Sequence, residues 1–193
     1  MVGKPWKDVP DLWKGEKQYL NWLRGQIRRI WSRHPIKHRY VAQRETSTPV
    51  AASALHLPIG CALTARTKRL RECEMCKQWY PPSWLEVDHI HGGVGFDNYE
   101  EFLEWQERML FVTFEDIREL CKTCHADVTL SQKLGCTLDA VPKERERIEF
   151  GKLKATKQNE TLATLNLKQG KNPAERVAIF NEHLEKKYGQ SDN

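Results

Sequence analysis

Two pairs of cysteines with the same spacing constrain this chain more than any other feature. The first pair is "CEMC", Cys73 and Cys76, and the second is "CKTC", Cys121 and Cys124. Two residues between sulfurs allow a tight turn to direct both thiolates at one ion about 2.3 Å away. Four thiolates form a closed tetrahedral shell with no open position. We therefore predict a structural Zn²⁺ site that joins two distant segments of the chain.

The residue after the second pair admits another interpretation. His125 directly follows Cys124, and Cys-x-x-Cys-His is the attachment signature of c-type haem. Haem attachment and disulfides both require export, but the sequence shows no basic start followed by an apolar run, so we expect no signal peptide. Haem would also leave the first cysteine pair without a purpose. Metal binding by the cysteines is the better explanation.

Composition and charge limit the class of protein. Only 39% of residues are hydrophobic and 30% are charged, and the longest apolar stretch, Val50–Leu63, is interrupted and too short to span a membrane. Residues 1–72 hold 15 Lys and Arg against 5 Asp and Glu, whereas residues 73–141 hold 5 against 13. An acidic centre beside a basic arm suits a site that holds a divalent cation while its flank holds a polyanion. Solvated helical faces would produce a similar imbalance.

Periodicity predicts several helices and one hairpin. Apolar residues recur at helical spacing over residues 15–32, and Pro35 is expected to end that segment. Residues 41–66 read as a linker or an irregular packed segment. Residues 70–92 suggest a hairpin around the first cysteine pair, with a strand over Trp84–Val87.

Further helices are expected in the second half of the chain. One covers "NYEEFLEWQERML", and a short one begins at the second cysteine pair. Two more are expected over residues 143–167 and 173–188, the last with Asn172 as its N-cap and Pro173 in its first turn.

The zinc site leaves the stretch "EVDHIHGG" unexplained. It places Asp88 and His89 at the end of a predicted strand, where successive side chains point to opposite sides. A bulge or turn at the strand end could, however, direct both into one pocket. The order Cys-x-x-Cys, Val-Asp-His-Ile with nearby glycines, and Leu-Cys-x-x-Cys-His-x-x-x-Thr resembles the zinc-binding HNH endonucleases, most closely the small nucleases of bacteriophages. The resemblance covers Cys73 to Thr129.

The resemblance implies an α+β fold: a ββα-metal core held by the four-cysteine zinc site and flanked by N- and C-terminal helices. It implies that His89 is the general base that activates water, and that Asp88 and His125 hold one catalytic divalent ion. That ion would be Mg²⁺ or Mn²⁺, although the mixed ligand set also admits Ni²⁺ or Zn²⁺. The family usually carries Asn at the position of Asp116, where it orients the loop of the base or contributes to the metal.

The substrate implied by this resemblance is DNA, with double-stranded DNA as the default and little sequence specificity. If about six cations contact phosphates, log K falls with log salt at a slope of about −5. The cations that we expect to contact DNA are Arg24, Arg28, Arg29, Arg33, Lys37, Arg39, Lys68, Arg69 and Arg71.

Two other functions stay open at this stage. A catalytically inactive, zinc-stabilised DNA-binding protein would share the cysteines and the basic arm, but would not need Asp88, His89 and His125 together. A packaging accessory that acts beside a phage terminase is compatible with nuclease activity. We expect a cytoplasmic protein, in the host cytoplasm if it is phage-encoded. The expected domains are a basic arm and linker over 1–66, a nuclease core over 67–141 and a helical extension over 142–193.

Overall fold

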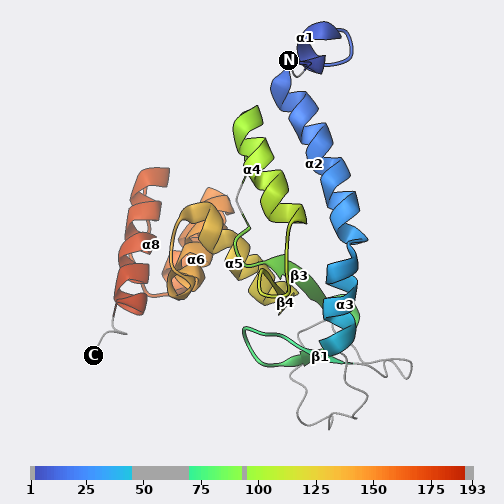
Figure 1. Cartoon of the computed structure of the whole chain (residues 1–193). Coiled ribbons are helices and arrows are strands. Elements are labelled where there is room, and N and C mark those ends of the chain that lie inside the picture. Colours follow the sequence, from blue (N-terminus) through green and yellow to red (C-terminus); the bar gives the residue numbers. More distant parts are fainter. Residues whose placement is uncertain (1–2, 45–69, 93–94, 190–193) are drawn as a thin grey trace. The chain divides into compact units, whose positions relative to one another are not determined.

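The computed structural model describes residues 3–44, 70–92 and 95–189 and shows a mixed α+β protein with two small sheets (Figure 1). The chain divides into two compact units, residues 1–133 and 134–193. The basic N-terminal helices therefore belong to the same unit as both cysteine pairs, whereas we expected a boundary near residue 66. The reason is that the apolar face of the long N-terminal helix is buried against a helix from the centre of the chain.

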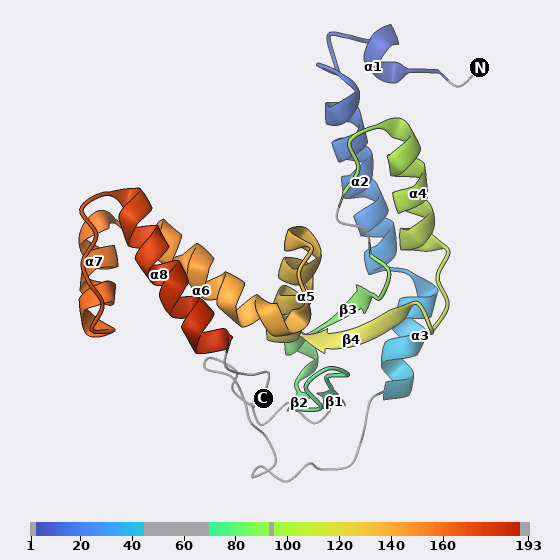
Figure 2. The same ribbon diagram turned by 90° about the vertical axis from the view of Figure 1, so that its left-hand side faces the viewer.

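That long helix is α2, Glu16–Ser32, and its partner is α4, Tyr99–Leu110. Figures 1 and 2 both show them side by side. Leu20 and Ile27 of α2 are buried with Phe102 and Trp105 of α4, which follows from apolar residues recurring at helical spacing on both helices. Asn98 caps α4, since its side-chain oxygen accepts a 2.9 Å hydrogen bond from the backbone N–H of Glu101.

The proline after α2 starts a helix as well as following one. Pro35 is the first residue of α3, Pro35–Arg44, a position that tolerates proline because its missing N–H has no helical partner. The first four residues of the expected irregular segment 41–66 complete α3, and the remainder lies outside the described residues. A short helix, α1, Pro5–Asp8, precedes α2.

The sheet region follows the predicted hairpin. Strand β1, Arg71–Glu72, pairs antiparallel with β2, Trp79–Tyr80. A 3-10 turn, Pro82–Trp84, leads into β3, Leu85–His89, which pairs antiparallel with β4, Ile117–Cys121. The expected strand thus begins one residue later and continues through His89. Helix α5, Lys122–Leu134, starts directly after β4, as predicted from the second cysteine pair.

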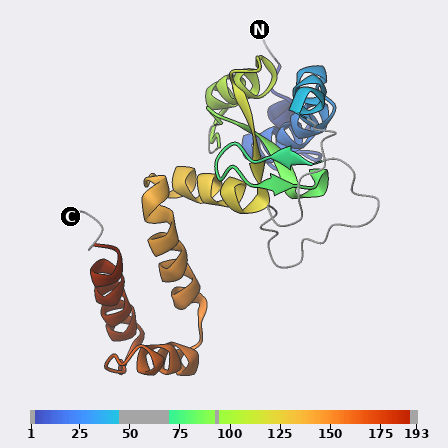
Figure 3. The ribbon, with the colours of Figure 1, turned by 90° about the horizontal axis from the view of Figure 1, so that it is seen from below.

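The second unit is helical. It contains a 3-10 turn, Leu138–Ala140, and the helices α6, Val141–Lys152, α7, Ala155–Thr164, and α8, Pro173–Tyr188 (Figure 3). The helix predicted over 143–167 was wrong in one respect: it is broken at Leu153, whose ψ of 146° is extended.

The break at Leu153 lets α6 and α7 both contribute to one apolar core, made of Phe150, Leu162, Phe180 and Leu184. The Asn172 cap on α8 is confirmed by a 2.9 Å bond from the N–H of Glu175. Within the described ranges, no helix combines the length and apolar character needed to cross a membrane.

Candidate functional site

The two cysteine pairs come together as predicted. The Sγ atoms of Cys73, Cys76, Cys121 and Cys124 all lie within 4.8 Å of one another. Zn²⁺ with bonds of about 2.3 Å holds sulfurs roughly 3.8 Å apart in a tetrahedron, so a small contraction of the cluster would satisfy the ion. The four cysteines can therefore hold a metal ion.

Local backbone geometry prepares these sulfurs to bind a cation. The N–H of Cys121 donates to the Cys73 sulfur at 3.2 Å. Burial opposes ionisation of Cys73, but such N–H groups outweigh it and lower the pKa of this thiol. Burial and the neighbouring sulfurs raise the pKa values of Cys76 and Cys124. Four thiolates thus repel one another until a cation joins them.

This cluster determines where the strands of the candidate site lie. Cys73 follows β1, whereas Cys121 ends β4 and Cys124 lies in the first turn of α5. The apolar residues packed around the cysteines include only a few large side chains, such as Tyr80 and Leu120. A metal ion bound here would connect the small hairpin to β4 and α5, where the hydrophobic core alone is modest.

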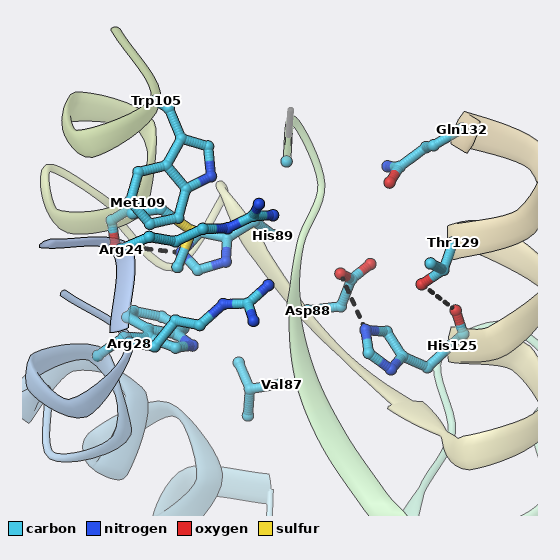
Figure 4. A pocket seen from close by; sticks show the side chains of 12 residues that line it. Arg24, Arg28, Val87, Asp88, His89, Trp105, Met109, His125, Thr129 and Gln132 are labelled. Carbon is cyan, nitrogen blue, oxygen red and sulfur yellow. Dashed lines mark hydrogen bonds and ion pairs between the residues drawn. The ribbon is translucent and has the colours of Figure 1, made fainter. Parts of the chain in front are cut away.

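A cavity of about 440 Å³ lies beside β3 and brings together the three residues expected in catalysis (Figure 4). Pairing of β3 with β4 is regular through His89, so this strand has no bulge there, and a turn follows it at Ile90 and His91. Asp88 and His89 point to opposite sides of β3, as alternation requires, and the cavity borders both sides (Figure 4). The lining residues are Arg24, Arg28, Trp31, Val87, Asp88, His89, Gly92, Trp105, Met109, His125, Thr129 and Gln132.

His89 is held as a neutral imidazole with one defined tautomer. Its side chain is 7% exposed, and its ring lies 4.1 Å from that of Trp31, centroid to centroid. Nε2 lies 3.2 Å from the carbonyl oxygen of Met109, which can only accept, so Nε2 carries the proton. Burial lowers the pKa of His89. The free lone pair on Nδ1 therefore makes His89 a suitable proton acceptor.

Asp88 and His125 face each other from β3 and α5. Asp88 Oδ1 lies 3.5 Å from His125 Nε2, and Nδ1 of the same imidazole contacts the Glu86 carboxylate. The hydrogen bond with Asp88, together with the charge of Glu86, raises the pKa of His125. Burial would raise the pKa of Asp88, but its bonds with His125 and Arg118 outweigh burial and lower it.

This pair fits a divalent ion that needs few protein ligands. With the imidazole proton on Nδ1 and donated to Glu86, Nε2 and the Asp88 carboxylate could bind one ion between them. Among the described residues, groups of three or more metal-binding side chains occur only at the cysteines. An ion at Asp88 would keep the rest of its shell for water or phosphate, as Mg²⁺ usually does.

Sequence reasoning missed Glu86 and Arg118. Glu86 lies two residues before Asp88, and this spacing on a strand places both on one face. Arg118 lies directly opposite Asp88 on β4, which only the register reveals. Its Nε and Nη2 both donate to Asp88 Oδ2 at 3.1 Å.

The structure places Asp116 outside the cavity lining. Its carboxylate accepts hydrogen bonds from the N–H and hydroxyl of Thr113, at 2.7 and 2.8 Å, and the N–H bond lowers its pKa. Its carbonyl oxygen accepts a 2.9 Å bond from the N–H of Ile90, next to His89. Asp116 therefore organises the loop before β4 and connects it to the segment after His89, and it contacts neither Asp88 nor His125.

The basic residues predicted to bind DNA occupy different surroundings. Arg24 and Arg28, one helical turn apart on α2, extend into the cavity (Figure 4). The Arg24 guanidinium lies 5.6 Å from the Trp105 ring, and burial lowers its pKa. Arg29, Arg33 and Arg39 are exposed on α2, at its end and on α3.

Three further residues predicted to contact DNA are Arg71, Lys68 and Arg69. Arg71 differs from the expectation: it is 5% exposed and its Nη2 lies 2.8 Å from the Glu119 carboxylate, so it is an internal ion-pair partner. Lys68 and Arg69 lie outside the described residues.

A second cavity of about 490 Å³ adjoins the first. Val87 and His125 line both cavities, and Lys37 and His38 of α3 line the second. Lys37 is half-buried, with its Nζ 5.6 Å from the Trp31 ring. The two cavities therefore lie next to each other beside β3, and the second is lined by the carboxylates of Glu86 and Glu119 as well as by Lys37.

Comparison with known proteins gives no match: no family model, no curated protein and no solved structure corresponds significantly to this chain.

Proposed function

We propose that this protein is a metal-dependent HNH-type endonuclease that hydrolyses phosphodiester bonds of DNA. The observation that carries the proposal is the shared cavity of His89, Asp88 and His125, in which the histidine most suited to act as a base lies across β3 from a carboxylate–imidazole pair. In this proposal β3, β4 and α5 form the ββα-metal core. The four cysteines hold a structural Zn²⁺ that keeps these elements together.

Each residue has a role that its contacts support. His89 Nδ1 accepts a proton from the attacking water, and the Met109 carbonyl stabilises the resulting imidazolium through Nε2–H. Arg24 and Arg28 bind the phosphate oxygens within the cavity. Asp88 and His125 would hold a divalent ion, which would supply positive charge to neutralise the phosphate and stabilise the departing 3′ oxygen.

The charges around the cavity support a polyanionic substrate. Arg24 and Arg28 of α2 line the first cavity and Lys37 of α3 lines the second, so cations from two helices border the cavities beside β3. These contacts are to phosphate rather than to bases, and they predict cleavage with little sequence preference.

The proposal is tested by conversion of supercoiled plasmid to nicked and linear forms with Mg²⁺, Mn²⁺ or EDTA. His89→Ala is compared at equal zinc content with His183→Ala, a histidine of the second unit. We expect metal-dependent cleavage by wild type and His183→Ala, and a loss of at least about 100-fold in His89→Ala with DNA binding retained. Plasmid that stays intact while wild type binds it would instead identify a catalytically inactive DNA-binding protein.

A further inference from the structure

The two oxygens of the Asp88 carboxylate have different partners. Oδ2 accepts both hydrogen bonds from Arg118, from Nε and Nη2 at 3.1 Å each. Oδ1 lies 3.5 Å from His125 Nε2. The carboxylate is therefore already divided between a cation on one oxygen and a histidine on the other.

The position of Arg118 follows from the sheet. It lies opposite Asp88 in the antiparallel register of β3 and β4, where side chains share a face about 5 Å apart at their Cβ atoms. The Arg118 side chain is 25% exposed and that of Asp88 is 13% exposed. Such a partly buried pair keeps its geometry better than an exposed one, because water competes less for its hydrogen bonds.

We propose that Arg118 remains on Asp88 Oδ2 when the divalent ion binds, and so restricts Asp88 to a single metal bond through Oδ1. This inference rests on the metal site of the proposed function and concerns how that site is tuned. Carboxylates bind divalent ions either through one oxygen or through both. A guanidinium on Oδ2 excludes the second mode and aligns Oδ1 with His125 Nε2.

Two consequences follow for the bound ion. One coordination position that a second carboxylate oxygen would fill stays open for water or a phosphate oxygen. The guanidinium charge also weakens the attraction of Asp88 for a cation. A unit charge roughly 5 Å from a divalent ion, in surroundings as polar as water, changes binding on the order of tenfold. Arg118 thus lowers metal affinity while it preserves open positions for the reaction.

The experiment measures Mn²⁺ binding without DNA, by the electron paramagnetic resonance signal of free Mn²⁺, and the number of waters on bound Mn²⁺ by water-proton relaxation. The full-length, zinc-loaded protein is used. Arg118→Met removes the charge and the hydrogen bonds, whereas Arg118→Lys keeps a cation able to bind Oδ2. Arg28→Met removes the same charge from the cavity lining without a contact to Asp88.

We expect Arg118→Met to bind Mn²⁺ about tenfold more tightly, with one water fewer on the ion, and Arg118→Lys to stay within about threefold of wild type. Equal or weaker binding by Arg118→Met overturns the inference. The inference is also overturned if Arg28→Met tightens Mn²⁺ binding to the same extent, because the effect would then come from the net charge around the cavity and not from the contact between Arg118 and Asp88. If Asp88→Asn leaves wild-type Mn²⁺ binding unchanged, no ion binds at Asp88, and the metal site of the proposed function fails together with the inference.

Discussion

Replacing Arg71 should damage the fold and leave the electrostatic part of DNA binding unchanged. Arg71 and Glu119 are 5% and 0% exposed, and Arg71 Nε donates to both Glu119 oxygens, at 2.8 and 3.0 Å. In Arg71→Met, Arg44 still lies beside that buried carboxylate, with its Nε 3.5 Å away. Removing one partner of a buried pair costs about 3–5 kcal/mol. Since Arg44 compensates in part, we expect about 3 kcal/mol, a fall in Tm on the order of 10 °C.

Urea unfolding followed by tryptophan fluorescence reports on the compact unit of residues 1–133, which contains Arg71, because all seven tryptophans precede residue 134. The matched variant is Arg28→Met, whose side chain is exposed beside the cavity. We expect Arg28→Met to change stability by less than about 0.5 kcal/mol. It should also reduce the slope of log K against log salt by about 0.9, as one lost phosphate contact would.

The double variant Arg71→Met with Glu119→Leu should recover most of the lost stability, since replacing a buried pair by apolar groups is often close to neutral. The reasoning is refuted if Arg71→Met keeps wild-type stability and instead lowers the salt slope. Arg71 would then contact DNA, as the sequence alone suggested.

Three further predictions concern the candidate site. Glu86→Ala should weaken Mn²⁺ binding about 10–100-fold by releasing the His125 ring, and unchanged affinity in a titration would contradict that role. The carboxylate partners of His125 raise its pKa, so at limiting Mn²⁺ protonation of His125 should already reduce activity at a pH above 6.5. Burial lowers the pKa of His89, so at saturating Mn²⁺ activity should fall only when the pH drops below 6.5. If the pH–rate profiles fall at the same acidic pH at limiting and at saturating Mn²⁺, this assignment of the two histidines is contradicted. Asp116→Asn should keep plasmid cleavage near wild type, since Asn can still accept the loop hydrogen bonds, whereas Asp116→Ala should reduce it; equal loss in both would point to a role in metal binding.

Local signals in the sequence predicted several elements correctly. The amphipathic pattern of α2, the Asn172 cap and the two Cys-x-x-Cys turns each depend on residues within a few positions of one another. Such interactions form wherever the rest of the chain lies, and periodicity or spacing therefore reveals them. Two local features were not predicted: Pro35, which follows α2 as expected, also begins α3, and the helix expected over residues 143–167 is broken at Leu153.

The candidate site also combines features that the sequence indicates with features that it does not. The sequence by itself determined the four-cysteine cluster and pointed to Asp88, His89 and His125, because their residue types and spacing carry the chemistry. It could not assign the surroundings that give these groups their charge states. The carbonyl bound to His89 comes from a residue at the end of α4, and the cation on Asp88 comes from the opposite strand.

The tertiary structure alone decided which charged residues face the cavity and which are internal. Arg71 and Arg28 have the same side chain, but Arg71 meets Glu119, 48 residues away, whereas Arg28 faces an open cavity. Residue type determines that a guanidinium will seek an anion. Which anion it finds depends on strand register and on the packing of distant elements, and these are set by the burial of the chain as a whole.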